Sequence, residues 1–201
     1  MKYAGAIALV LAAAGGAGAV VAASAAGRHS ARPSAETCGG QLWQLKTLSD
    51  RSRGRVELAP RNTTIAAILA RRGPGRPPTR RTTAFQLHTW EVPAQITAYK
   101  IDSTGSVRLV LFDHDAYMNA VIPSPACLTS ATRDRAAIAE AWRTFMTKCG
   151  KATRDWQSFG GILFVRGVGF WSQKRGFRGA APNGAELHPV TGLRIVVGCR
   201  G

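Results

Sequence analysis

The stretch Phe85–Ile122, FQLHTWEVPAQITAYKIDSTGSVRLVLFDHDAYMNAVI, carries the pattern that decides the fold. It is rich in β-branched and aromatic residues, and apolar residues alternate with polar ones along much of it, as in half-buried strands. Asp102–Gly105 and His114–Ala116 interrupt this pattern with turn residues. The stretch therefore predicts three consecutive strands joined by tight turns, at residues 85–101, 107–113 and 117–122. We expect Pro93 to break or bulge the first of them.

An amphipathic helix is predicted after these strands, at Thr132–Lys148. Apolar residues recur there at helical spacing on one face, and they are Ile138, Ala141, Trp142 and Phe145. We expect Trp142 and Phe145 to lie in the core. Asp134 suits the first turn of the helix, and Gly150 can end it.

Two further strand patterns follow the helix. Ile162–Phe170 predicts a strand that bends sharply at Gly167 and Gly169, and Ala185–Val197 predicts a final strand interrupted at Pro189–Gly192. The resulting order is β-β-β-α-β-β. This is the order of the OB-fold, a mainly β, five-stranded Greek-key barrel with a helix between its third and fourth strands.

In that fold, ligands contact the face of strands 2 and 3 and the loops between strands 1 and 2 and between strands 4 and 5. Here these loops are Asp102–Gly105 and the basic, glycine-rich Ser172–Gly184. The second loop lies within Gly167–Val190, GVGFWSQKRGFRGAAPNGAELHPV. We expect the rest of the chain to form a scaffold that exposes this stretch.

The N-terminal residues have the features of an export signal. Lys2 supplies a short positive region, an uncharged Ala-rich stretch follows, and small residues around Ala25 suit a signal peptidase. An uncleaved membrane anchor is the alternative, because the uncharged stretch is long enough to span a bilayer. We expect a signal peptide at 1–26, an N-terminal extension at 27–82 and the barrel domain at 83–201. The protein would then be secreted or associated with the cell envelope, with no membrane span after cleavage.

The extension is expected to contain little regular structure. Thr63–Ala70 predicts a short helix with Thr63 or Thr64 as its N-cap, and Cys38–Leu48 predicts an extended or irregular segment. Arg71–Arg81, RRGPGRPPTRR, contains no apolar residue to bury and predicts a solvated basic loop, with a nucleic-acid-binding or membrane-binding patch as the alternative.

The four cysteines predict two disulfides, because an even number in an exported chain favours pairing. They are Cys38, Cys127, Cys149 and Cys199. Three pairings are possible, and a helix of about 22 Å between Cys127 and Cys149 disfavours a bond between those two. No CxxC motif or Cys/His cluster with zinc spacing occurs, so we expect neither a metal site nor a cofactor.

A formal net charge of +16 favours polyanionic partners: nucleic acid, an anionic cell-wall polymer or glycan, or anionic lipid. A compositional bias towards Arg is the alternative explanation of the charge. Cations beside an aromatic ring in a barrel loop resemble a single-strand-binding surface. The candidate binding residues at this loop are Trp171, Lys174, Arg175, Phe177 and Arg178.

Glu186 and His188 are two residues apart on a predicted strand, so their side chains share a face. They are a candidate acid–base pair, in which the carboxylate orients the imidazole, or, in the favoured interpretation, a brace in which His188 binds a backbone carbonyl and Glu186 binds an Arg or a loop N–H. Asp113, His114 and Asp115 could suggest a metal site, but adjacent turn residues point in different directions, and we expect a solvated turn.

Three segments resemble a family of exported bacterial proteins of unknown function with a small OB-like barrel. They are LKTLSD at Leu45–Asp50, Ile96–Asp113 continuing into NAVIPSPAC at Asn119–Cys127, and GVGF…APNGAELHPV at Gly167–Val190. The resemblance implies export and a barrel fold but no activity. Where members of that family often carry an Asp and a His-Gly, this chain has Ser172 and Arg175.

We therefore expect a secreted, non-enzymatic binding module that holds a polyanion or glycan through residues 172–184, with no catalytic residues. A metal-dependent hydrolase or nuclease on an OB-like barrel would need convergent carboxylates, and the eleven acidic residues are scattered singly. A structural envelope protein with a protein partner is the remaining alternative.

Overall fold

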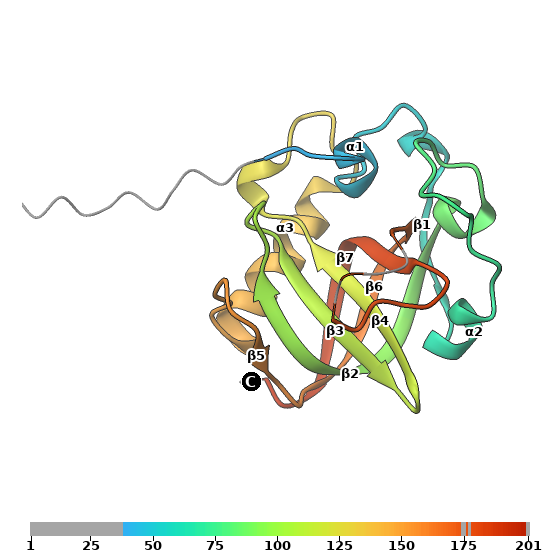
Figure 1. Ribbon diagram of the computed structural model, residues 1–201. Helices are drawn as coiled ribbons and strands as arrows, with labels where there is room; N and C mark the ends of the chain where they lie inside the picture. The colour runs from blue at the N-terminus through green and yellow to red at the C-terminus, as the bar shows by residue number, and fades with distance from the viewer. Residues whose placement is uncertain (1–37, 174–175, 177, 200–201) are drawn as a thin grey trace, which may run out of the picture. The chain divides into compact units, whose positions relative to one another are not determined.

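The structure, a computed structural model, describes residues 38–173, 176 and 178–199 (Figure 1). Five of its strands form a closed barrel, and they are β2 (His88–Ile101), β3 (Val107–Asp113), β4 (Ala116–Ile122), β6 (Ile162–Trp171) and β7 (Ala185–Val197). The strand order is β2-β3-β4-β7-β6, and β6 pairs with β2 to close the barrel. This confirms the predicted OB-like fold.

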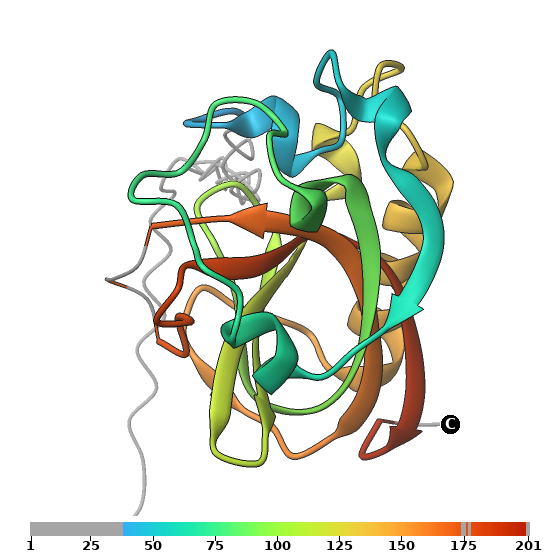
Figure 2. The same ribbon diagram turned by 90° about the vertical axis from the view of Figure 1, so that its right-hand side faces the viewer.

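The directions of the strands also agree with the OB-fold. The β4–β7 pair is parallel, with Asn119 opposite Glu186, and the other barrel pairs are antiparallel. A parallel pair requires a long crossover connection. The helix α3 (Arg135–Thr144) and the strand β6 supply it between β4 and β7 (Figures 1 and 2).

The two prolines predicted to interrupt strands do not do so. Pro93 lies inside β2 and pairs with Phe164 of β6, while pairing with β3 begins only at Gln95. Pro93 therefore has one paired neighbour strand, a position in which proline is tolerated. Pro189 follows a cis peptide bond within β7, which continues through the predicted interruption at 189–192; the strand does not end there, but its pairing with β6 is irregular over these residues.

Glycine in β6 permits the bend that was predicted there. The register of the β6–β7 pair shifts on both sides of Gly167. A Cβ atom at Gly167 would meet the carbonyl oxygen of Pro189 at 2.9 Å, closer than real side chains come. Only glycine therefore lets β7 approach β6 at this point.

The helix α3 is shorter at its start than predicted. Asp134 has a left-handed backbone, with φ of 59°, so the helix begins at Arg135, and it continues as a π-helix, Phe145–Cys149, up to Gly150. Phe145 is fully buried, as expected. Trp142 is only partly buried, and it packs against the edge of the core.

The predicted extension adds structure to the barrel. A short helix, α1 (Trp43–Lys46), replaces the expected irregular segment, and β1 (Glu57–Asn62) pairs in parallel with the start of β2. The second helix, α2 (Ile65–Leu69), is close to its prediction, because the Thr64 hydroxyl accepts a hydrogen bond from the Ala67 N–H at 3.1 Å. Its two isoleucines lie in the barrel core.

The loop predicted to be solvated over residues 71–81 ends in a buried arginine. Arg81 donates to the Asp50 carboxylate, to the carbonyl of Gln86 and to that of Leu45, at 3.1, 3.1 and 2.9 Å. Its side chain is 0% exposed. The prediction of a wholly solvated loop is therefore wrong at its last residue, which ties the N-terminal segment to the barrel.

Two disulfides join Cys38 to Cys127 and Cys149 to Cys199. The bond disfavoured from helix length, between Cys127 and Cys149, does not occur. The first disulfide fixes residue 38 beside the end of β4, and the second fixes the last turn after α3 to the end of β7. Disulfides of this kind indicate an oxidising environment.

Among the described residues, no helix is both long enough and apolar enough to cross a bilayer.

Replacing Arg81 tests the buried ion pair. Arg81→Leu leaves the Asp50 carboxylate buried without its partner, and this should lower the free energy of unfolding by roughly 3–5 kcal/mol. Urea denaturation followed by tryptophan fluorescence measures the change. Arg61→Leu removes the exposed pair with Glu57 and is the control, for which we expect little change. Equal effects of the two substitutions would contradict the role assigned to Arg81.

Candidate anion-binding site

One cavity of about 610 Å³ brings together cations from four separate parts of the chain. We call it the basic pocket and define it by Lys46, Lys100, Arg108, Arg154, Trp156 and Arg178, which line it together with the turn Asp102–Thr104. It lies beside the β2–β3 turn and the β6–β7 loop, the two loops that contact ligands in OB-folds.

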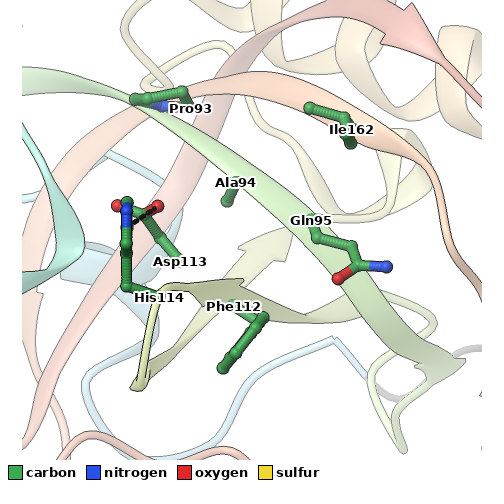
Figure 3. A pocket seen from close by; sticks show the side chains of 7 residues that line it. All are labelled: Pro93, Ala94, Gln95, Phe112, Asp113, His114 and Ile162. Atoms are coloured by element: carbon green, nitrogen blue, oxygen red, sulfur yellow. Dashed lines mark hydrogen bonds and ion pairs between the residues drawn. The ribbon is translucent and has the colours of Figure 1, made fainter.

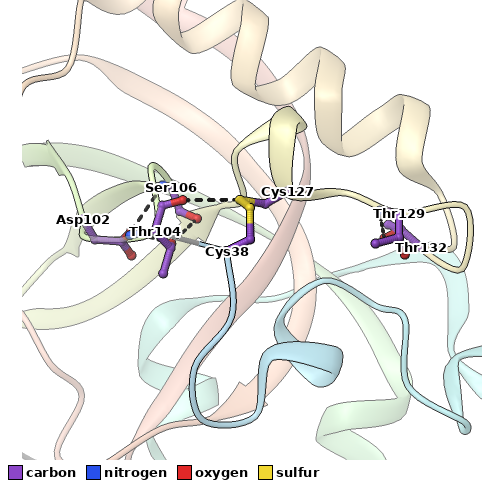
Figure 4. The surroundings of a disulfide bond; sticks show 7 residues. All are labelled: Cys38, Asp102, Thr104, Ser106, Cys127, Thr129 and Thr132. Atoms are coloured by element: carbon purple, nitrogen blue, oxygen red, sulfur yellow. Dashed lines mark hydrogen bonds between the residues drawn. A yellow bond between two sulfur atoms is a disulfide. The ribbon is translucent and has the colours of Figure 1, made fainter. Parts of the chain in front are cut away.

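The β2–β3 turn forms one wall of the pocket and has a rigid shape. One carboxylate oxygen of Asp102 accepts hydrogen bonds from the Thr104 N–H, the Thr104 hydroxyl and the Ser106 N–H, at 2.9, 2.6 and 3.2 Å. The disulfide lies against the same turn, with Cys127 Sγ 3.7 Å from the Thr104 carbonyl oxygen (Figure 4). The Asp102 side chain therefore stabilises the wall.

Two cations face each other across this turn. Lys100 of β2 and Arg108 of β3 are directly opposite in the antiparallel register. Side chains at opposite positions lie on the same face of the sheet, where like charges destabilise the pair. Lys100 and Arg108 therefore repel each other where they line the pocket.

Trp156 supplies the aromatic part of the pocket. It is half-buried and directly precedes β5 (Gln157–Ser158), which pairs with β2 at Tyr99 and so holds the indole beside Lys100. The Lys100 ammonium is 5.2 Å and the Arg178 guanidinium 5.8 Å from the centre of a Trp156 ring. Both distances are within the range of cation–π attraction.

Behind the pocket, β7 contributes a buried charge network. Glu186 contacts Arg108 Nη1 at 3.3 Å and His188 Nδ1 at 3.0 Å, and both β7 side chains are 3% exposed. The prediction that Glu186 and His188 share a face is confirmed. The favoured interpretation holds for Glu186, which binds an arginine. It is wrong for His188, because Nδ1 contacts Glu186 and the buried Nε2 has no hydrogen-bond partner among the described residues, so neither nitrogen binds a backbone carbonyl there.

Burial and neighbouring charges shift the pKa values of this network. Burial alone would raise the pKa of Glu186, but Arg108 and then His188 outweigh it and lower that pKa from 4.5 to about 2. Burial lowers the pKa of His188 below 6.5, against the opposing effect of Glu186. Glu186 is therefore an anion and His188 neutral at pH 7.

Lys46 reaches the pocket from α1. Burial lowers its pKa below 10.5, and the charge of Arg108 acts in the same direction, while Glu186 and Asp102 oppose both. Its ammonium is 5.9 Å from the centre of the Phe170 ring. Lys46 is thus a partly desolvated cation that stands close to other charged groups.

The structure brings some predicted site residues together and moves others away. Arg178 lines the pocket, and Glu186 lies behind it. Trp171 is buried and donates its indole N–H to the Thr83 hydroxyl at 2.9 Å, so the prediction that it offers a stacking platform is wrong. Three other predicted residues, Lys174, Arg175 and Phe177, lie outside the described residues.

Four of the pocket's cations and its aromatic ring were missed in the sequence. Lys100 and Arg108 flank the predicted ligand loop at Asp102–Gly105, and this position was a signal that could have identified them. Lys46, Arg154 and Trp156 carry no comparable signal, because they reach the pocket only through tertiary packing.

A second surface cavity, of about 250 Å³, lies at the β3–β4 turn (Figure 3). His114 Nδ1 is 2.8 Å from the Asp113 carboxylate, and the His114 side chain is exposed. Asp115 is also exposed, as expected for a solvated turn. Within the described part of the chain, no three His, Cys, Asp or Glu side chains converge as metal ligands would.

The pKa of Glu186 predicts an acid-sensitive fold. Its charged form is stabilised in the folded state, so its contribution to stability is complete above pH 4.5 and is lost as the pH falls towards 2. The loss should be on the order of 3 kcal/mol and should be absent in Glu186→Gln. Urea unfolding at a series of pH values measures it. Asp115→Asn, at an exposed carboxylate, should keep the wild-type dependence, and a wild-type dependence in Glu186→Gln would contradict the assignment.

Comparisons with known proteins add little to this account. No protein-family model matches the sequence, and no curated protein matches it. Among solved structures, this chain is similar to one described as a candidate aspartyl-tRNA synthetase from Leishmania major Friedlin, at 12% identity and a TM-score of 0.41. The match covers 71% of this chain and 22% of that chain. The OB-like fold is therefore established by the strand pairing of this chain itself.

Proposed function

We propose that this protein is an exported, non-enzymatic binding module that holds a polyanion, such as single-stranded nucleic acid, an anionic cell-wall polymer or an anionic glycan, in the basic pocket. The observation that carries the proposal is the convergence of five cations and one indole ring on a single cavity between the two OB-fold ligand loops. Fold alone would not support it, because OB-folds bind many unrelated ligands.

The charge balance of the pocket supports an anionic ligand. Among the residues that line it, five are cations and one, Asp102, is acidic, and Glu186 binds Arg108 from behind. Lys100 and Arg108 repel each other across the sheet. A bound anion would attract both side chains and so offset this repulsion.

The carboxylates beside the pocket support binding rather than hydrolysis. Asp102 accepts three hydrogen bonds from its own turn, and Glu186 is held by Arg108 and His188. A hydrolytic metal site requires carboxylates that converge on open space. Both groups instead stabilise the walls of the cavity.

The remaining features fit an exported protein. Two disulfides suit an oxidising compartment outside the cytoplasm, and residues 1–26 have the pattern of a signal peptide. The resemblance of Leu45–Asp50, Asn119–Cys127 and Gly167–Val190 to a family of exported bacterial proteins points the same way. A net charge of +16 would attract such a protein to anionic envelope polymers.

A salt series tests the proposal. The purified protein should bind a fluorescent single-stranded oligonucleotide and a fluorescent anionic oligosaccharide, with an affinity that falls steeply as salt rises. The triple variant Lys100→Ala, Arg154→Ala, Arg178→Ala should flatten the plot of log affinity against log salt, by about one unit of slope for each phosphate that the protein no longer neutralises. Fluorescence anisotropy at several salt concentrations gives the slopes.

A matched variant removes the same charge elsewhere. Arg135, Lys148 and Lys151 are exposed and lie outside the basic pocket, so replacing all three by Ala should leave most of the affinity and slope unchanged. If both triple variants weaken binding equally, only net charge matters and the pocket is not the site. If no probe binds at low salt, the protein is not a polyanion-binding module.

A further inference from the structure

The cations of the basic pocket lie at two depths. The Arg108 side chain is 9% exposed, Lys46 and Lys100 are both half-buried, and Arg154 and Arg178 are exposed. Of the two lysines, Lys46 is the one whose pKa is lowered by burial. Arg108 is also held from behind by Glu186. Lys46 and Arg108 therefore form the floor of the pocket, and the other three cations form its rim.

The Lys46 ammonium has unused hydrogen-bonding capacity. The Lys46 ammonium can donate three hydrogen bonds, and none of the described residues accepts one from it. Burial disfavours its charged form, and the attraction of Glu186, which exceeds the repulsion of Arg108, offsets this only in part. A negatively charged acceptor between Lys46 and Arg108 would supply the missing hydrogen-bond partner of the ammonium.

The indole already takes part in two cation–π contacts. The Lys100 ammonium and the Arg178 guanidinium are 5.2 and 5.8 Å from the centre of a Trp156 ring. The other large aromatics of this region, Phe170 and Trp171, are buried. Recognition in the described part of the pocket therefore depends on charge, with Trp156 holding two of the rim cations in position.

Because the floor of the pocket lies deeper than its rim, the floor is more accessible to the end of an anionic chain than to its middle. A phosphodiester has two unsubstituted oxygens and chain on both sides, so both sides would have to leave past the rim. A phosphate monoester has three unsubstituted oxygens and one attachment, so it can enter the floor while its chain stays at the rim. Three charge-bearing oxygens can also accept hydrogen bonds from Lys46 and Arg108 together.

We propose that the floor of the basic pocket, between Lys46 and Arg108, holds a phosphate monoester at the end or on a branch of an anionic chain, while Lys100, Arg154 and Arg178 hold the adjoining chain. This inference rests on the proposed function and adds the group that is recognised. The monoester can belong to a nucleic acid or to a phosphorylated glycan, and the two share the same chemistry at the floor.

Paired probes test the inference. An oligothymidylate of about 12 nucleotides, a length within the range that OB-folds cover, is compared with and without a 5′-phosphate. A second pair is an oligosaccharide with and without one phosphate monoester. In each pair the phosphorylated probe should bind about tenfold more tightly. Whichever phosphorylated probe binds more tightly, the oligonucleotide or the oligosaccharide, identifies the kind of polymer that carries the phosphate monoester.

Three variants test whether the tighter binding of the phosphorylated probes depends on the floor of the pocket. Lys46→Met should reduce the ratio of the two affinities in each pair to about one, whereas Lys148→Met, which removes an exposed lysine outside the pocket, should keep the wild-type ratio. Arg178→Ala should weaken both members of a pair and keep their ratio. Inorganic pyrophosphate, which carries terminal phosphate groups without a chain, should compete with the phosphorylated probe.

The outcomes separate this inference from the proposed function. If the polymers bind in a salt-dependent way but the phosphorylated and unphosphorylated probes bind equally to the wild type, the monoester site is wrong and the polyanion site stands. A wild-type ratio in Lys46→Met would also overturn the assignment to the floor. If none of the probes binds, the proposed function fails and this inference fails with it.

Discussion

The pairing of β2 on both sides is the constraint on which the structure depends. This strand has fourteen residues, of which residues 95–101 lie along β3 and residues 89–95 along β6. Because one strand joins both neighbours, the sheet closes into a barrel and buries its inner side chains in a single core. The same strand also pairs with β1 and β5, so the N-terminal segment and the indole of Trp156 are attached to it.

The basic pocket follows from this closure. Lys100 lies near the end of β2, and the tight turn that follows places Arg108 opposite it. The parallel pairing of β7 with β4 brings Glu186 behind Arg108, although the two are 78 residues apart in the sequence. The pocket is thus assembled from positions that only the closed barrel brings together, and its cations are supported by a buried carboxylate.

Local patterns predicted most of the barrel from the sequence. Alternating apolar residues identified the strands, helical spacing identified α3, and Thr64 identified the start of α2, because each of these signals arises from neighbours in the chain. Where prediction failed, the cause was a distant contact. Arg81 is buried because it pairs with Asp50, which is far away in the sequence. Trp171 lies in the core, and this was not predicted because an apolar run does not show which of its aromatic side chains face outward.

The site was predicted less well than the fold for the same reason. The β6–β7 loop contributes Arg178, but most of the positive charge of the pocket comes from β2, β3, α1 and the segment before β5. Basic residues are frequent along this chain, so composition does not distinguish those that converge from those that do not. The register of the strands distinguishes them, because it places Lys100 directly opposite Arg108.

Nuclear magnetic resonance can show directly whether anionic ligands enter the basic pocket. Amide and indole signals of ¹⁵N-labelled protein are recorded while a short anionic oligonucleotide is added. We expect the largest changes at the indole of Trp156 and at the backbone amides of residues 100–108. Changes of equal size spread over all basic surfaces, or centred on the β3–β4 turn at His114, would contradict this expectation.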